Sequence, residues 1–253
     1  MRLFLIPVLL SSVVAVSACS EAQEYEAKVG VKTESARDTD ETPRTVDAEP
    51  GALKLENERI EFSHTWPAAA NAIPALAARF EREAQSALDE AQAMAAEDQA
   101  AARGDGWEFR THSAEKEWKT VADITDWLSL SALIYSYTGG AHPNYGYDSL
   151  VWDRKADKAR APLDLFRSPS AFKTALWGEF CDALDAERAE RRGEPVDPAS
   201  TDGFSTCPEP REVTVLLGSG NRETFDRIGI LIGPYVAGPY AEGSYEFTFP
   251  VDS

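Results

Sequence analysis

Residues 127–152 read WLSLSALIYSYTGGAHPNYGYDSLVW, and this stretch decides the fold class. Residues 127–137 are rich in leucine and aromatic side chains, and residues 145–152 alternate between apolar and polar ones, as half-buried strands do. Gly139-Gly140 and Pro143-Asn144 lie between the two runs and are typical of a turn. The stretch therefore predicts two strands joined by a shaped loop.

The chain on the N-terminal side of this stretch predicts three further elements. Apolar residues within 53–62 indicate a first strand or a bent pair of strands. Residues 68–103 are alanine-rich and carry apolar side chains at three- and four-residue spacing, which predicts a helix that ends at Gly104-Asp105-Gly106. Residues 107–118 alternate loosely and predict a strand.

The chain on the C-terminal side predicts a second helix and three more strands. Ser168-Pro169 provides a capping residue followed by a proline in the first turn, and the helix ends at Gly193. Gly218-Ser219-Gly220 is interpreted as a hairpin turn. The remaining strands are expected at residues 212–217, 224–232 and 245–251. This order of elements predicts an α+β fold, with a mostly antiparallel or mixed sheet and two main helices packed on it.

The first residues of the chain predict a lipoprotein signal. Arg2 supplies a positive charge, residues 3–16 form an apolar run, and Ser17-Ala18 lead into Cys19, whose thiol can take a lipid. A single transmembrane anchor and an ordinary cleaved signal are the alternatives. The run is shorter than the ~20 residues of a spanning helix and contains a proline, and an ordinary signal needs no cysteine.

Three segments are expected along the chain. Residues 1–18 would be the signal peptide, residues 19–50 an acidic flexible tether, and residues 51–253 a single folded domain. The tether has almost no large apolar side chains and carries nine acidic and four basic ones after Cys19, so it cannot bury enough surface to fold. The whole chain has a net charge of -18, which disfavours nucleic acid as a partner and favours basic proteins or cations.

The cysteines predict one disulfide bond. Lipidation uses Cys19, which leaves Cys181 and Cys207 as an even pair in an oxidising compartment. Closing this loop would stabilise the fold by at most about 3.5 kcal/mol. Two independent buried thiols are the alternative.

Two loops rich in glycine and tyrosine are the candidate binding surface. The first follows residue 136, and the second is residues 233–243, which read GPYVAGPYAEG. Glycine permits close backbone approach, and tyrosine offers rigid amphipathic contact area. We expect the two loops to be neighbours in space, either as a ligand-facing surface or as structural connections that pack on the sheet. The candidate residues are Tyr137, Thr138, Gly139, Gly140, His142, Asn144, Tyr145, Tyr235, Tyr240 and Glu242.

Signatures of catalysis are missing from the sequence. There is no zinc-ligand spacing, no nucleophile elbow, no phosphate loop and no dinucleotide fingerprint. We therefore expect no catalytic residue, no metal and no cofactor. His64 and His112 occur in strand-like stretches and are interpreted as sheet or surface residues.

The motif Tyr-Thr-Gly-Gly-Ala-His at 137–142, the Leu-Asp-Leu-Phe run at 163–166 and the loop at 234–243 together resemble a family of extracytoplasmic domains. Members of that family precede the catalytic domain of PdaC-type peptidoglycan deacetylases or form the outer part of RsiV-type anti-sigma factors, which sense lysozyme. The resemblance covers roughly residues 53–251 and implies an α+β accessory domain. The deacetylase catalytic domain, with its metal site, has no counterpart in this chain.

These observations together predict a lipid-anchored, non-enzymatic binding module of the bacterial cell envelope. Ser20 after the lipidated cysteine favours the periplasmic face of the outer membrane. The expected ligand is a basic protein such as lysozyme, or a cell-wall component. Two alternatives remain: a cell-wall hydrolase or esterase that uses His142 with a carboxylate, and a purely structural envelope lipoprotein.

Overall fold

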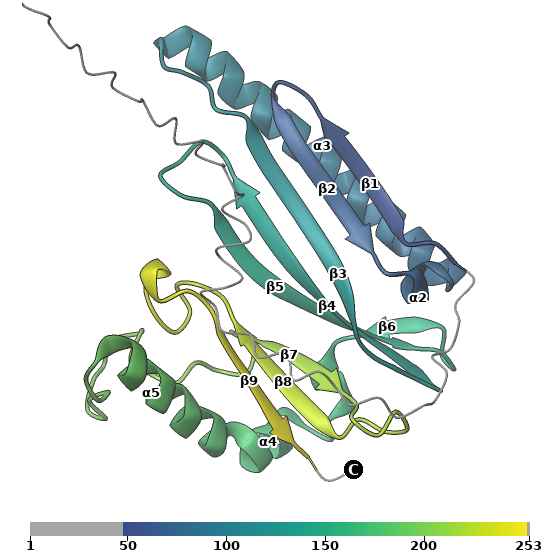
Figure 1. Cartoon of the computed structure of the whole chain (residues 1–253), viewed down its shortest axis with the longest axis vertical. Coiled ribbons are helices and arrows are strands. Elements are labelled where there is room, and N and C mark those ends of the chain that lie inside the picture. Colours follow the sequence, from purple (N-terminus) through teal and green to yellow (C-terminus); the bar gives the residue numbers. More distant parts are fainter. Residues whose placement is uncertain (1–47, 252–253) are drawn as a thin grey trace, which may run out of the picture. The chain divides into compact units, whose positions relative to one another are not determined.

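The computed structural model describes residues 48–251, which form a six-stranded sheet, a three-stranded sheet and two main helices (Figure 1). The α+β class predicted from the sequence is confirmed. The signal peptide, Cys19 and nearly all of the expected tether lie outside the described residues. Within residues 48–251, no helix combines the length and the apolar character that a membrane span requires.

The first sheet is mixed. Its strands, in their order across the sheet, are β1 (Gly51–Glu56), β2 (Ile60–Trp66), β3 (His112–Ile124), β4 (Trp127–Tyr137), β5 (Asn144–Asp153) and β6 (Lys158–Arg160). The β2–β3 pair is parallel and every other pair is antiparallel. A parallel pair needs a long crossover between its strands, and helices α2 (Ala68–Asn71) and α3 (Pro74–Asp105) make that crossover.

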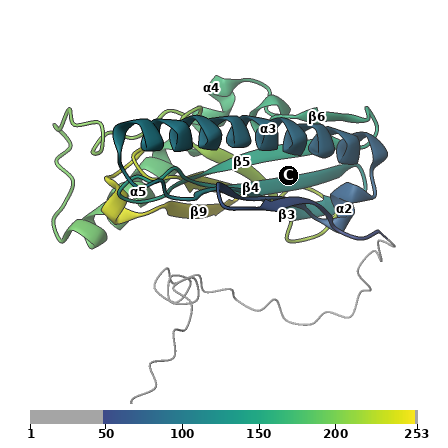
Figure 2. The ribbon, with the colours of Figure 1, turned by 90° about the horizontal axis from the view of Figure 1, so that it is seen from above.

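Helix α3 covers one face of the first sheet (Figure 2). Pro74 occupies its first turn, and Gly106 ends it with a φ of 77°, in the left-handed region that favours glycine. Phe80 of α3 is fully buried and stacks on Trp118 of β3, with ring centroids 5.0 Å apart. The rest of this core consists of Trp66, Ala70, Leu76, Ala84, Leu128, Leu130, Ala132, Leu150 and Trp152.

The second sheet is antiparallel and has its own helical cover. Its strands are β7 (Thr214–Gly218), β8 (Arg227–Ile232) and β9 (Tyr245–Pro250), and its cover is α4 (Pro169–Phe172), a π-helical turn (Lys173–Trp177) and α5 (Gly178–Arg192). Short 3-10 turns are η1 (Pro162–Leu165) and η3 (Tyr240–Glu242). Strand β7 lies against β3, β4 and β5, so the second sheet packs on the first sheet. Phe172, Phe180 and Leu184 fill the core between helix and sheet.

Several sequence-based boundaries are wrong. The strand expected at 107–118 is β3, which begins later and runs to Ile124. A bulge between Thr120 and Ala122 interrupts its alternation, and this interruption conceals its second half. The three-residue strand β6 was not expected. The two helices cover different sheets, whereas one shared sheet was predicted.

The connection between β7 and β8 is also longer than the predicted hairpin turn. Strand β7 ends at Gly218, and β8 begins at Arg227. The Asp226 carboxylate accepts a hydrogen bond from the backbone N–H of Gly220 over 2.7 Å. The backbone N–H of Asp226 donates to the Gly218 carbonyl over 3.1 Å. These bonds close a loop of several residues in place of a tight turn.

The predicted Cys181–Cys207 disulfide is confirmed, with Cα atoms 5.6 Å apart. It joins α5 to the segment that precedes β7. The buried indole of Trp177 donates a hydrogen bond to the Pro208 carbonyl over 3.0 Å, next to the disulfide. The long loop after α5 is therefore held to the helix at two adjacent points.

Candidate functional site

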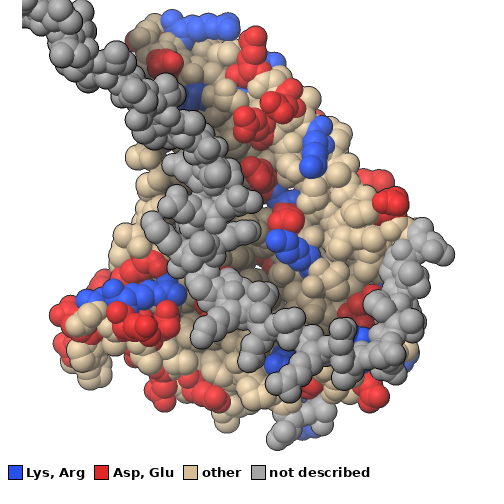
Figure 3. All heavy atoms as spheres, in the orientation of Figure 1, with Lys and Arg blue, Asp and Glu red and all other residues tan. Residues whose placement is uncertain are grey.

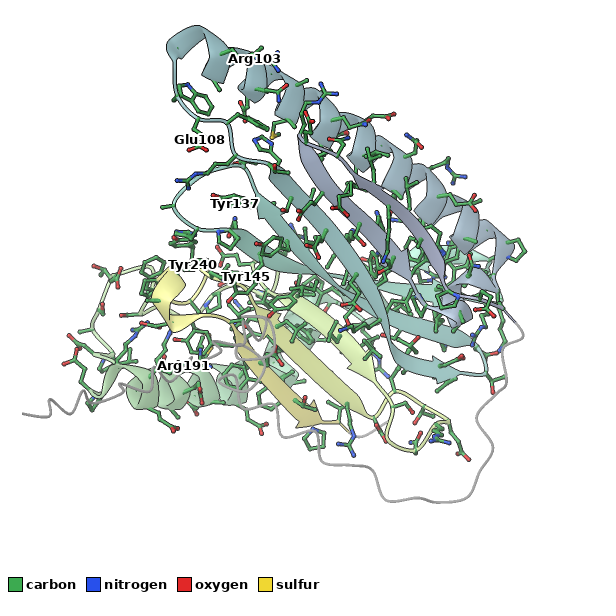
Figure 4. All side chains as sticks on the ribbon, turned by 45° about the horizontal axis from the view of Figure 1, so that its top comes forward. Arg103, Glu108, Tyr137, Tyr145, Arg191 and Tyr240 are labelled. Atoms are coloured by element: carbon green, nitrogen blue, oxygen red, sulfur yellow. A yellow bond between two sulfur atoms is a disulfide. The ribbon has the colours of Figure 1, made fainter. Side chains whose placement is uncertain are left out.

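The two loops rich in glycine and tyrosine meet in space, as the sequence predicted. The His142 ring, in the β4–β5 loop, stacks on Tyr240 with ring centroids 3.9 Å apart and an interplanar angle of 24°. Tyr145 contacts Tyr240 edge-on at 6.1 Å, and Tyr235 lies 5.8 Å from Tyr240. Figure 4 shows Tyr145 and Tyr240 beside each other at this junction. We call His142, Tyr145, Tyr235 and Tyr240 the aromatic platform.

Backbone geometry brings the loops together. Gly233 lies against β5: a Cβ there would be 3.5 Å from both the Gly146 Cα and the Tyr145 carbonyl oxygen, which is ordinary van der Waals contact. Tyr235 has a φ of 68°, which is rare for a bulky residue, and its N–H donates to the Gly238 carbonyl over 2.9 Å. The Tyr235 side chain nevertheless stays 50% exposed.

Hydrogen bonds orient the His142 ring. Its Nδ1 lies 2.8 Å from the Pro143 carbonyl oxygen, which can only accept, so Nδ1 carries a proton and donates. In the neutral ring, Nε2 then accepts from the Tyr235 hydroxyl, 3.2 Å away. The contacts of this ring within residues 48–251 are thus a carbonyl and tyrosine side chains.

Three arginines of α5 contact the second loop, residues 233–243, or the strand that follows it. Arg188 is fully buried and donates from Nε to the Ala237 carbonyl over 3.0 Å and from Nη2 to the Thr206 carbonyl over 2.9 Å. Arg192 donates to the Ala237 carbonyl over 3.2 Å. The Arg191 guanidinium lies over the Tyr245 ring, 3.9 Å from its centroid, and Figure 4 shows Arg191 on the helix below the loop. The aromatic platform therefore has a rigid base.

Glu242 belongs to this base. Its two carboxylate oxygens accept from Arg192 over 2.9 and 3.0 Å, and the Tyr245 hydroxyl also donates to it. Burial opposes ionisation of Glu242, but the hydrogen bonds from Arg192 and Tyr245 outweigh it and lower the pKa of this carboxyl. Burial, followed by the bond to Glu242, raises the pKa of Tyr245 to about 12.

The remaining candidate residues surround the platform. Tyr137 accepts a hydrogen bond from Arg110 over 3.1 Å, and Thr138, Gly139 and Gly140 line a separate cleft. Asn144 begins β5 and is exposed.

Tyr147 was not among the predicted candidate residues. Its hydroxyl donates to Ser244 over 2.9 Å and links β5 to the second loop. The alternation of the strand was the available signal, since it places Tyr145 and Tyr147 on one face of the sheet.

The other two histidines lie in strands and are buried. His112 of β3 lies 3.3 Å from the Asp98 carboxylate. His64 of β2 is 2% exposed, and neither ring nitrogen has a hydrogen-bond partner in the structure. Burial, together with the nearby Lys116 charge, lowers the pKa of His64 to about 4. In the part of the chain that the structure describes, no three histidine, cysteine, aspartate or glutamate side chains cluster as metal ligands would.

The comparisons with known proteins agree with this architecture. Residues 53–145 match the family model described as "Deacetylase PdaC". A DUF3298-family protein from Bacteroides fragilis has a similar crystal structure, with 17% sequence identity, a TM-score of 0.51, and coverage of 81% of this chain and 91% of that one. A DUF3298-family protein from Pseudomonas aeruginosa PAO1 is also similar, at 18% identity and a TM-score of 0.47, with coverage of 80% and 90%.

The resemblance predicted from the sequence motifs is thereby confirmed: residues 53–145 match the PdaC family model, and the fold is similar to that of a DUF3298-family protein. The family model matches the segment from β1 to the start of β5, and the structural likeness to the Bacteroides protein extends over most of the fold. At this level of identity the likeness concerns the fold alone. No protein among those with curated functions matches the chain.

Proposed function

We propose that this chain is a lipid-anchored binding module of the cell envelope that acts without catalysis and engages a basic protein through the aromatic platform. Tyr235 carries the proposal. A bulky residue held in a sparsely populated backbone region costs of order 1–3 kcal/mol. Half of the Tyr235 side chain remains in contact with solvent, so core packing does not explain that cost. Presentation of the ring to a partner does explain it.

The rigidity of the platform supports the same proposal. Interface residues that contribute most to binding are often tyrosines set on a rigid base, because little side-chain entropy is then lost on association. Arg188 and Arg192 fix the backbone that carries Tyr235 and Tyr240, and His142 stacks on both rings. A purely structural loop would not need to keep this arrangement at the surface.

Charge favours a basic partner. The chain has a net charge of -18, and Figure 3 shows acidic side chains spread over one face with basic ones interspersed. Helix α5, which supports the platform, exposes Glu179, Asp182 and Glu190. Such a field would speed encounter with a positively charged protein, and lysozyme is one protein of that class.

The anchor would place this module at a membrane surface. In this proposal Cys19 carries the lipid, residues 20–50 extend the domain away from the bilayer, and the outer-membrane periplasmic face is the site of action. A partner in the same compartment would then meet a module of fixed location.

The test is a titration of the full-length chain with lysozyme, in which tryptophan fluorescence or calorimetry measures the binding. Tyr235→Gly removes the ring and suits the left-handed backbone, so it isolates binding from folding. We expect at least about tenfold weaker binding by this variant and stronger binding at low salt. Trp107→Ala is the matched control. It also removes a half-exposed aromatic ring, but one that is far from Tyr235 in the sequence. Equal binding by Tyr235→Gly and the parent chain would refute the role of the platform.

A further inference from the structure

A cleft of about 540 Å³ lies between the segment after α3 and the β4–β5 loop. One wall is formed by Trp107, Glu108 and Arg110, and the other by Thr138 together with the backbone of Gly139 and Gly140. Figure 4 shows Glu108 and Tyr137 on the two segments that border it. Its volume falls within the range of small-molecule sites. The aromatic platform begins at His142, so the cleft and the platform use different residues of one loop.

Trp107 is the most exposed of the six tryptophans. Four of the six tryptophans in the chain, Trp66, Trp118, Trp152 and Trp177, are at most 6% exposed, whereas Trp107 is 50% exposed. The N–H groups of Gly106 and Trp107 both donate to the Ala102 carbonyl, over 2.9 and 3.2 Å. The helix end therefore holds the Trp107 backbone in place, while much of the indole faces solvent.

A hydrogen-bond donor, Arg110, and an acceptor, Glu108, line the same cleft as this indole. Arg110 donates to the Tyr137 hydroxyl over 3.1 Å, which orients its guanidinium. Glu108 is exposed and provides carboxylate acceptors in the same wall. Opposite them, Gly139 has a φ of 84°, and a Cβ there would lie 3.5 Å from the Arg110 Cβ. The positive φ favours glycine at this position, and the loop backbone thus lies within van der Waals range of the charged wall.

This combination selects a ligand class. A flat apolar surface suits a ring with an apolar face, and adjacent donors and acceptors suit hydroxyl groups, each of which both donates and accepts. Glu108 would repel an anionic ligand and Arg110 a cationic one. We propose that the cleft binds a pyranose unit of a neutral glycan, with one face on Trp107 and hydroxyl groups on Glu108, Arg110 and the Gly139-Gly140 backbone. This site goes beyond the proposed function and does not depend on the aromatic platform.

The experiment titrates the full-length chain with neutral tetrasaccharides of glucose and of N-acetylglucosamine, and with an acidic tetragalacturonate. Tryptophan fluorescence and the indole N–H signal of Trp107 report the contact in the parent chain, and calorimetry measures the affinity of the parent chain and of each variant. We expect at least one neutral tetrasaccharide to shift both signals and the acidic one to bind at least about tenfold more weakly. Trp107→Ala should weaken binding of the neutral tetrasaccharide about tenfold or more, because it removes the stacking surface.

Tyr235→Gly is the control, since it changes a half-exposed aromatic residue of the platform and leaves the cleft intact. Binding of no tetrasaccharide, or preference for the acidic one, would overturn the proposal. So would full binding by Trp107→Ala, or an equal loss in Tyr235→Gly. A parent chain that binds the neutral tetrasaccharide but not lysozyme would contradict the proposed function alone, so the two failures are distinguishable.

Discussion

The Arg188 guanidinium donates from Nε to the Ala237 backbone carbonyl over 3.0 Å, with no part of Arg188 exposed to solvent. This bond links the last turns of α5 to the loop that carries Tyr235 and Tyr240. A buried guanidinium is stable only where its donors are satisfied, and here backbone carbonyls supply most of the acceptors. Helix α5 therefore determines the shape of the platform from inside the fold.

Replacement of Arg188 should destabilise the whole fold. Arg188→Met would leave the Thr206 carbonyl without this donor and the carbonyl of the buried Ala237 with Arg192 as its donor, and we expect a loss of about 2 kcal/mol or more in the free energy of unfolding. Urea denaturation measures it. The control is Arg79→Met, which removes an exposed ion pair with Glu83 on α3 and should cost less than about 1 kcal/mol. Similar losses in the two variants would contradict the role given to Arg188.

Loss of the disulfide should release the loop after α5. The bond closes a segment of 26 residues, for which the chain-entropy model gives at most about 3.5 kcal/mol. The Cys181→Ala, Cys207→Ala double variant should unfold at a correspondingly lower urea concentration. Proteolysis of residues 194–206 should become faster than in the parent chain. An unchanged urea midpoint would show that Trp177 and Arg188 hold this segment without the disulfide.

His64 should make the fold sensitive to mild acid. Its pKa is about 4 in the folded protein, mainly because of burial, against 6.5 when exposed. As the pH falls, the unfolded chain takes up the proton first, so this stability is complete above pH 6.5 and is lost between about 6.5 and 4. The loss reaches at most about 3 kcal/mol. His64→Leu should flatten that part of the stability profile, measured by urea denaturation at several pH values.

Acidic groups act at lower pH and can be separated from this effect. The pKa of Glu242 is lowered from its usual 4.5, so its contribution is present above that value and disappears as the pH falls further. A parent chain whose stability is constant from pH 6.5 to 5 would show that the buried His64 takes up a proton without cost to the fold.

Cys19→Ala should abolish incorporation of a labelled fatty acid. Cys19 is the residue to which the signal-like segment leads, and the expected anchor depends on its thiol. Metabolic labelling followed by membrane fractionation makes the measurement, with Cys181→Ala as a control that keeps Cys19. Labelling that persists in Cys19→Ala would exclude this lipidation site.

His142→Ala and Tyr240→Ala distinguish a binding surface from scaffolding. If the platform binds a partner, each variant should lose partner capture while its melting temperature stays close to that of the parent chain. If the rings only pack, the melting temperature should fall by several degrees. Normal capture by a fully folded double variant would end the binding hypothesis.

Local signals made part of the fold predictable. Helix α3, strands β4 and β5 and the disulfide follow from periodicity, turn residues and cysteine pairing, all of which act over short stretches or leave one choice. The partners of the strands were harder to foresee. The parallel β2–β3 pair and the separate second sheet depend on contacts between distant residues, which periodicity does not encode.

The site shows the same limit. The meeting of the two loops was expected, because both combine glycine with tyrosine. Arg188 was overlooked, although it continues the four-residue spacing of Phe180 and Leu184 and so lies on the buried stripe of α5. The cleft around Trp107 has no sequence signal, because its two walls come from segments about thirty residues apart that only the fold brings together.

The β4–β5 pairing bears on how this chain can be shortened. The family match ends at residue 145, the second position of β5, yet the ladder between the two strands runs from Ser136 and Asn144 to Trp127 and Asp153. A fragment cut at that boundary would leave β4 as an open edge with leucine side chains beside it. Such edges recruit strands from other molecules, so the fragment should self-associate. Recombinant truncations of this chain should therefore keep both sheets.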